Sequence, residues 1–163
     1  MLAQALAAAA LALPGFHVSS NAPDGGTLLS GSIPFAHNRV NPGYVYLPPG
    51  FTETRRYPVV YLLHGMPGSP QEYAHSLQLA SWSDAQISSG ALRPFIAVAP
   101  AAVTRKSAEW AGPWETYLVH DVVPWVDTHL PTIATPRGRV LAGLSAGGFG
   151  AVDIGLRDRK SVV

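Results

Sequence analysis

A serine between small residues carries the clearest chemical signal in the chain. It lies in the run Gly143–Gly147, which reads Gly-Leu-Ser-Ala-Gly and follows an apolar segment over residues 139–143. A plausible helix over residues 149–156 comes next. A G-x-S-x-G pattern at a strand-to-helix junction forms a tight, strained turn that holds the serine hydroxyl clear of its neighbours. The pattern therefore predicts that Ser145 is a nucleophile. The small neighbours that this turn requires are Gly143, Ala146 and Gly147.

A glycine-rich run after a strand has two other uses. It lets a helix approach the sheet closely, or it cradles a phosphate group at the helix N-terminus. Residues 143–148 lack the Gly-Lys-Ser/Thr sequence of a Walker loop and the G-x-G-x-x-G sequence of a dinucleotide loop. The strand before the run and the helix after it favour the nucleophilic serine.

A second loop with chemical potential is His64-Gly65-Met66-Pro67-Gly68, which follows the apolar run 58–63. Parallel strands end at one edge of their sheet, so this loop is expected to face Ser145 across the crevice where such sheets bind ligands. A serine that attacks a carbonyl group needs two backbone N–H donors aimed at the developing oxyanion. We expect the amides of Met66 and Ala146 to be these donors, with Gly65 in the supporting loop.

His64 has two candidate roles, as a base or as a structural residue that holds its loop by hydrogen bonds. The structural role is favoured because the base of this arrangement follows the serine along the chain. All six histidines precede Ser145, and the only acidic residues after it are Asp153 and Asp158. Asp153 falls inside the expected helix, where a triad acid does not lie. We therefore expect the triad acid and histidine to be absent from this sequence.

An aromatic segment over residues 110–117 follows the apolar run that ends before Pro100. Trp110 and Trp114 are candidates for the wall of a substrate pocket. Equally, both tryptophans are candidates for the core. Glu115, near the start of a helix, then only stabilises that helix by interacting with its dipole. The sequence leaves these alternatives open.

The strands that would position these loops are continuous apolar runs over residues 58–63, 95–99 and 139–143. Such runs are typical of strands buried on both faces of a parallel sheet. Before them, residues 27–33 and 43–47 predict a short antiparallel pair joined through turn-forming residues.

Helices are expected between these strands, over residues 71–86 and 115–130. Pro124 falls inside the second helix and should kink it. Strands that alternate with helices predict an α/β fold with a mostly parallel sheet and helices on both faces.

Composition narrows the classes of partner. The 163 residues are 47% hydrophobic and 13% charged, which fits a folded chain of one domain. The net charge is +1 and the longest basic runs are pairs, so no nucleic acid partner is expected. The chain has no cysteine, which excludes disulfides, zinc–thiolate sites and a cysteine nucleophile. No metal or organic cofactor is implied.

The two ends differ from the middle. Residues 1–13 are uncharged and rich in Ala and Leu, which fits a signal peptide, the remnant of a membrane helix or an ordinary alanine-rich helix. Membrane attachment through this segment, secretion and a cytoplasmic location thus stay open. Residues 14–26 read as a linker, which makes 1–26 an N-terminal segment and 27–157 the domain. Residues 158–163 resemble a translated sequencing adapter, so we expect an artefactual tail.

Four blocks together resemble the putative esterase family of α/β-hydrolases, which includes S-formylglutathione hydrolases, feruloyl and siderophore esterases and mycolyltransferases. The resemblance covers roughly residues 27–157. The blocks are Tyr44-Val45-Tyr46-Leu47-Pro48-Pro49-Gly50, Tyr57-Pro58-Val59-Val60-Tyr61-Leu62-Leu63-His64-Gly65, Trp114-Glu115-Thr116-Tyr117-Leu118 and Gly143-Leu144-Ser145-Ala146-Gly147-Gly148.

The resemblance implies a serine esterase with Ser145 as nucleophile and the amides of Met66 and Ala146 as oxyanion hole. It implies a small-molecule ester or thioester as substrate, and an α/β-hydrolase fold whose later strands are missing. A chain cut in this way should be inactive and should leave residues 139–143 as an exposed apolar edge. Two alternatives remain, an acyltransferase of the same family and a non-catalytic hydrolase-like binding module.

Overall fold

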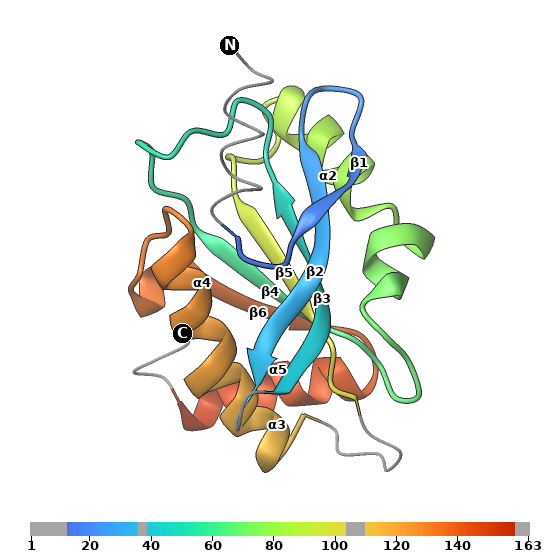
Figure 1. The fold of residues 1–163 in the computed structure, drawn as a ribbon, viewed down its shortest axis with the longest axis vertical. Helices are drawn as coiled ribbons and strands as arrows, with labels where there is room; N and C mark the ends of the chain where they lie inside the picture. Colours follow the sequence, from blue (N-terminus) through green and yellow to red (C-terminus); the bar gives the residue numbers. More distant parts are fainter. Residues whose placement is uncertain (1–12, 36–38, 104–109, 159–163) are drawn as a thin grey trace.

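The computed structural model describes residues 13–35, 39–103 and 110–158. In this part of the chain, the strands form one sheet of six in the order β1-β2-β3-β5-β4-β6, and helices pack against it (Figure 1). The strands are β1 His17–Asn21, β2 Thr27–Phe35, β3 Arg39–Leu47, β4 Val59–Leu63, β5 Ile96–Pro100 and β6 Arg139–Gly143. The α-helices are α2 Leu79–Ser88, α3 Pro113–Thr116, α4 Val123–His129 and α5 Ala146–Arg157. Shorter segments are the π-helical η1 Glu72–Ser76 and η2 Tyr117–Val122 and the 3-10 turn η3 Pro136–Gly138.

The sheet is mixed. β4 pairs in parallel with β5 and β6, whereas β1–β2, β2–β3 and β3–β5 are antiparallel pairs. The α/β class is confirmed, as is the antiparallel pair expected near the start of the domain. The expectation of a mostly parallel sheet holds only for β5, β4 and β6. Short connections between β1, β2 and β3 permit only antiparallel pairing, because a parallel crossover needs a dozen or more residues.

The predicted linker over residues 14–26 is wrong. Strand β1 lies within it and pairs with β2, and Leu13 and Phe16 are buried in the core. Strand β1 reads His-Val-Ser-Ser-Asn and all five residues are exposed, so its sequence lacks the alternation of apolar and polar residues that predicts a strand. The folded domain therefore includes residues well before Thr27.

The expected helix over residues 71–86 is divided in two. Gln78 separates η1 from α2 and has a left-handed backbone with φ 48°. The helical stretch around residues 115–130 does form, but as α3, η2 and α4 in succession. Pro124 lies in the first turn of α4, directly after the π-helical η2, so the helical hydrogen-bonding pattern changes next to the proline.

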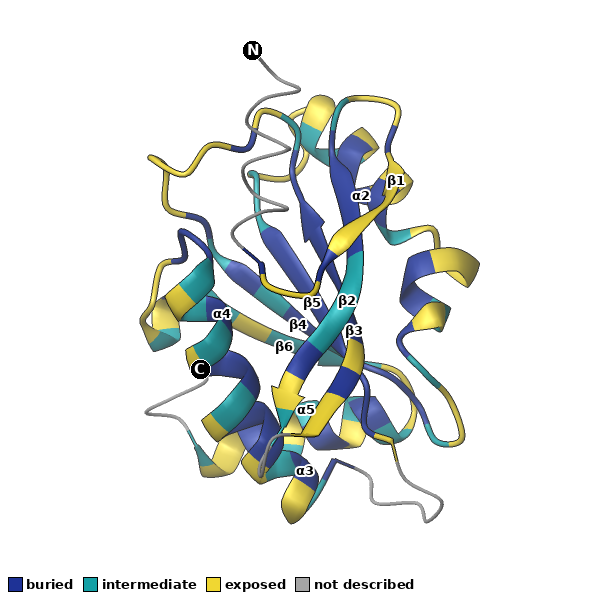
Figure 2. Cartoon of the chain, in the orientation of Figure 1, coloured by how far each residue is buried: buried dark blue, intermediate teal, exposed yellow. Residues whose placement is uncertain are grey.

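Apolar clusters lie on both faces of the sheet, and Figure 2 shows β5 buried along its length. In β4, Val59, Tyr61 and Leu63 belong to the layer that includes residues of η2, α4 and α5, whereas Leu62 packs against the layer on the α2 side. All five residues of β5 are buried. The apolar runs at β4 and β5 thus mark strands that are covered on both sides, as expected, whereas β6 has no fully buried residue.

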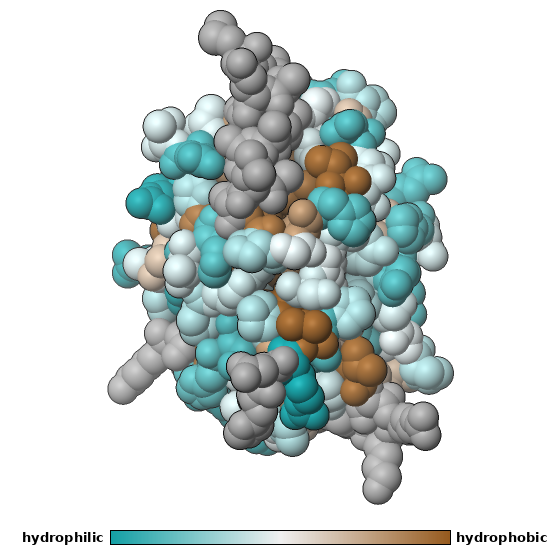
Figure 3. Space-filling view, in the orientation of Figure 1, coloured by the Kyte–Doolittle hydropathy of each residue, from teal (hydrophilic) through white to brown (hydrophobic). Residues whose placement is uncertain are grey.

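Strand β6 lies at an edge of the described sheet, as the sequence predicts. Val140 in this strand is 51% exposed, and α5 beside it exposes Phe149, Val152 and Leu156. On the face shown in Figure 3, apolar side chains form separate groups among polar ones. None of the described helices is long and apolar enough to cross a membrane. All but the last residue of the candidate signal or membrane segment 1–13, and all but the first residue of the expected tail 158–163, lie outside the described residues.

Candidate active site

Ser145 occupies the bend between β6 and α5. Its backbone has φ 51° and ψ −119°, which places a non-glycine residue in a conformation that L-residues rarely adopt. The residue is exposed. Such a conformation costs on the order of 1–3 kcal/mol and persists only where the surrounding structure enforces it. The strained turn expected from the G-x-S-x-G pattern is present in the structure.

Two glycines make this bend sterically feasible. A Cβ atom on Gly143 would lie 2.2 Å from the carbonyl carbon of Gly147, and one on Gly147 would lie 1.8 Å from the carbonyl oxygen of Leu63. The amide of Leu144 donates to the same Leu63 oxygen over 3.2 Å. The first turn of α5 therefore rests directly on the ends of β4 and β6, and neither glycine position has room for a side chain.

The loop after β4 faces Ser145, as the sequence predicts. A Cβ atom on Gly65 would lie 3.4 Å from both Cβ of Ser145 and the carbonyl oxygen of Leu144. The backbone at Gly65 thus lies next to the bend itself. Met66 follows in this loop and is half-buried.

The amides of Met66 and Ala146 are the two candidate oxyanion donors. Within the described part of the chain, neither amide donates a hydrogen bond to a protein acceptor. Ala146 is the first residue of α5, where helix geometry leaves the N–H free and the helix dipole favours negative charge. The preceding carbonyl, that of Ser145, accepts from the amide of Phe149 over 3.0 Å, which fixes the orientation of the peptide that carries the Ala146 N–H.

His64 is fully buried and engages both of its ring nitrogens within the protein. Nδ1 lies 2.7 Å from the carbonyl oxygen of Gly65, and the amide of Ala102 donates to Nε2 over 3.0 Å. A nitrogen that accepts from an amide carries no proton, so the network assigns a neutral ring with the proton on Nδ1. Burial lowers the pKa of His64 from its ordinary value, which also favours the neutral ring. These contacts match the structural role favoured from the sequence.

The two tryptophans differ. Trp110 is fully buried and its indole Nε1 donates to the carbonyl oxygen of His64 over 2.9 Å, so the core alternative applies and Trp110 is not a pocket wall. Trp114 is 9% exposed and stacks on Phe35 with 5.5 Å between the ring centroids. Together with Phe35, Arg39 and Val103 it lines a surface pocket of about 620 Å³. For Trp114, the pocket alternative stays open.

Among the described residues, no histidine or carboxylate forms a hydrogen bond with Ser145. Asp153 lies in α5, where it pairs with Arg157 over 3.1 Å, as expected for a residue that is not a triad acid. Three other histidines form hydrogen bonds away from Ser145: His17 with Ser30, His75 with Tyr44, and His129 with the carbonyl oxygen of Trp125. Residue 37 lies outside the described residues.

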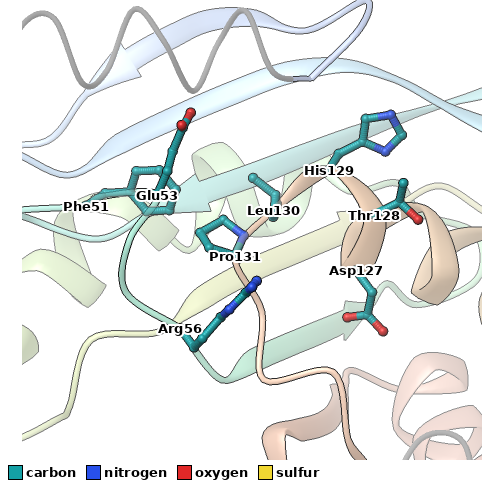
Figure 4. A pocket seen from close by; sticks show the side chains of 8 residues that line it. All are labelled: Phe51, Glu53, Arg56, Asp127, Thr128, His129, Leu130 and Pro131. Carbon is teal, nitrogen blue, oxygen red and sulfur yellow. The ribbon is translucent and has the colours of Figure 1, made fainter.

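A polar pocket of about 450 Å³, which sequence reasoning did not suggest, lies before the start of β4 (Figure 4). Parallel strands begin there, so it is at the opposite end of β4 from the Gly65 loop. Its Asp127 accepts from Thr132 Oγ1 over 2.6 Å and pairs with Arg139 of β6, and these bonds tie α4 to the sheet. The lining residues are Phe51, Glu53, Arg56, Asp127, Thr128, His129, Leu130 and Pro131.

The sheet and its helices have the arrangement of an α/β-hydrolase fold, with Ser145 at the bend between β6 and α5. Comparison with known proteins agrees: the chain belongs to the putative esterase family, whose model matches residues 36–162. That match includes residues 158–162, so it does not separate the expected tail from the domain.

Three relatives illustrate the family. An esterase of Mycobacterium tuberculosis is 35% identical over 121 residues, which cover 69% of this chain and 25% of that protein. An endo-1,4-beta-xylanase/feruloyl esterase of Xylanibacter ruminicola is 31% identical over 124 residues, covering 69% of this chain and 17% of that protein. A solved ferulic acid esterase superposes with a TM-score of 0.75 at 28% identity, covering 84% of this chain and 55% of that one. The chain thus spans about a quarter or less of these curated relatives and about half of the solved structure.

Proposed function

We propose that the protein is a serine carboxylic ester hydrolase with Ser145 as its nucleophile. The observation that carries this proposal is the backbone of Ser145, which has φ 51° in an exposed bend beside Gly65. A strained serine at a strand-to-helix turn, with a second loop against it, is the arrangement that acyl transfer through a serine requires. Membership of the putative esterase family supports the same chemistry.

In the proposed reaction, Oγ of Ser145 attacks the carbonyl carbon of the ester while a base removes the hydroxyl proton. The electron pair of the C=O bond moves onto its oxygen, and the amides of Met66 and Ala146 stabilise the resulting oxyanion. Collapse of this intermediate breaks the bond to the leaving alcohol or thiol, which takes the proton. Water then attacks the acyl-serine in the same way and releases the acid.

We propose that the base and the triad acid come from a part of the protein outside this chain. Both ring nitrogens of His64 are engaged, and the described residues offer Ser145 no other histidine partner. Since the chain spans only about half of the solved ferulic acid esterase, the remainder of the protein has room to supply these groups. The 163-residue chain alone should then hydrolyse esters only slightly, through binding and the oxyanion hole.

The substrate that we propose is an ester of ferulic acid. The solved relative at 28% identity is a ferulic acid esterase, and the Xylanibacter ruminicola relative includes a feruloyl esterase.

The test uses the protein expressed from its complete reading frame. A fluorophosphonate probe should label the wild type and the Ser88→Ala control, whose substitution is at an exposed site on α2, but not Ser145→Ala. Methyl ferulate should be hydrolysed, with release of ferulic acid and without transfer to added sugar or lipid alcohols. Labelling that survives Ser145→Ala would exclude Ser145 as the nucleophile, and preferential transfer to an added alcohol would indicate an acyltransferase.

A further inference from the structure

The direction of the Met66 amide is set by the neighbouring residue His64. The N–H of Met66 and the C=O of Gly65 belong to one trans peptide group, so they point in opposite directions. The Gly65 oxygen lies 2.7 Å from Nδ1 of His64, which donates to it. Turning the imidazole ring would therefore turn the peptide that carries the Met66 amide.

The imidazole and backbone of His64 are in turn held by residues from the segment after β5. The amide of Ala102 donates to Nε2 over 3.0 Å, and Nε1 of Trp110 donates to the His64 carbonyl oxygen over 2.9 Å. The Trp110 ring also packs against the imidazole edge to face, with 5.4 Å between centroids and an interplanar angle of 71°. Trp110 thus contacts both the main chain and the side chain of His64.

The backbone of Trp110 indicates that this placement is enforced by its surroundings. Trp110 has φ 58°, yet it is fully buried and carries a bulky side chain. A non-glycine residue with such a backbone costs on the order of 1–3 kcal/mol, which its packing and hydrogen bond must offset. In the described residues, the other non-glycine positions with positive φ are Gln78 and Ser145.

We propose that Trp110 is a positioning residue that holds His64 so that the Gly65–Met66 peptide presents its N–H to the oxyanion. The inference rests on the proposed function, in which the Met66 amide is an oxyanion donor. Because Trp110 is fully buried, we expect its effect to fall on the chemical step and not on substrate binding.

The kinetic test is Trp110→Phe in the protein from the complete reading frame. This change keeps an aromatic ring but removes the indole N–H. We expect kcat to fall by about tenfold to a hundredfold, because one oxyanion donor is worth about a hundredfold to a thousandfold and a misaligned donor retains part of this. KM should stay within about twofold. The matched control is Trp82→Phe on α2, where the side chain is 56% exposed and kcat should not change. An unchanged kcat in folded Trp110→Phe would overturn the proposal.

A second measurement does not depend on activity. Hydrogen exchange of the 163-residue chain, followed by mass spectrometry, reports the Ala102 amide that bonds to His64 Nε2. In Trp110→Phe this amide should exchange about tenfold faster than in wild type or Trp82→Phe, because the imidazole is no longer held. Unchanged exchange would overturn the inference. An inactive wild-type protein would instead overturn the proposed function, and faster exchange in Trp110→Phe would then show only that Trp110 holds His64 in place.

Two substitutions of His64 separate its contacts if Trp110→Phe does not fold. In His64→Asn, Nδ2 takes the place of Nδ1 and still donates to Gly65; in His64→Gln, Oε1 takes the place of Nε2 and still accepts from Ala102. We expect kcat of the asparagine variant to exceed that of the glutamine variant by about tenfold, since only the asparagine orients the Met66 peptide. The reverse order, or equal values, would show that the Gly65 bond does not aim the amide.

Discussion

Gly147 lies against the carbonyl oxygen of Leu63 so closely that a Cβ atom at this position would be 1.8 Å from that oxygen. The contact joins the first turn of α5 to the end of β4. The Gly65 loop begins just after Leu63, and Ser145 precedes Gly147 by two residues. This single contact therefore brings Ser145, the candidate nucleophile, close to the Gly65 loop.

Gly147→Ala should therefore disrupt the site. The added methyl group would clash with β4 unless α5 moved away from it. Overpacking of this kind lowers the free energy of unfolding by about 1–3 kcal/mol or more. We expect urea denaturation to show a decrease of this size in the free energy of unfolding, or a variant that does not fold. The neighbouring Gly148→Ala is the milder comparison: its Cβ would lie 3.1 Å from the oxygen of Gly143, a tight contact that needs only a small backbone shift, and alanine favours the helix. Equal stability of both variants would contradict the close contact.

Ser145→Gly should raise stability while it abolishes probe labelling in the complete protein. Glycine adopts a backbone with φ 51° at little steric cost, so the strain at this bend is relieved by about 1 kcal/mol. Ser145→Ala also removes the hydroxyl but keeps a Cβ atom, and should bring no such gain. The comparison of the two unfolding free energies in the 163-residue chain isolates the strain; a glycine variant no more stable than the alanine variant would rule it out.

Acid should destabilise the chain through His64. Burial lowers the pKa of this imidazole below its ordinary value of 6.5, so between the folded and the unfolded pKa only the unfolded state binds the proton. The contribution of His64 to stability is thus complete above about pH 6.5 and is lost as the pH falls toward the folded pKa. Its slope is at most about 1.4 kcal/mol per pH unit. Unfolding free energies between pH 8 and 5 should fall more steeply in wild type than in His64→Asn.

Asp84 of α2 should stabilise the turn between β1 and β2. Its buried carboxylate accepts from the amides of Asp24 and Gly26, each over 3.0 Å, and from the hydroxyl of Tyr46 over 2.7 Å. Asp84→Ala leaves these donors without an acceptor, which should cost about 3 kcal/mol or more. Asp84→Asn keeps one oxygen and should cost less. Thermal melting of both variants checks this order, and a neutral alanine variant would show that the bonds do not stabilise the turn.

The apolar side chains around β6 should cause the 163-residue chain to self-associate. Val140, Phe149, Val152 and Leu156 are between 51% and 64% exposed, and an edge strand offers unpaired backbone groups to another chain. Sedimentation velocity should show species larger than a monomer that grow with concentration. The double variant Val152→Lys/Leu156→Lys should reduce them, whereas Leu92→Lys, at another exposed apolar site, should not. A monodisperse wild-type monomer would contradict the prediction.

The parts of the fold that could be predicted are those encoded by neighbouring residues. The apolar runs at β4, β5 and β6 identified three strands, of which β4 and β5 are covered on both faces, and the Gly143–Gly147 run indicated a tight turn between strand and helix. Both signals are local, because strand burial follows from side-chain type along a short run and the turn follows from small residues at fixed spacing. Family membership, predicted from four short blocks, is confirmed by the family model that matches residues 36–162.

What only the tertiary structure decided depends on residues far apart in the chain. Strand β1 has no apolar pattern of its own and forms because β2 offers it a partner. His64 is held by Ala102 and Trp110, which lie 38 and 46 residues away, so no local pattern could assign Trp110 to the core instead of a pocket. Local propensity describes a residue and its immediate neighbours, whereas these placements follow from which elements pack together, and that is determined by burial of the whole core.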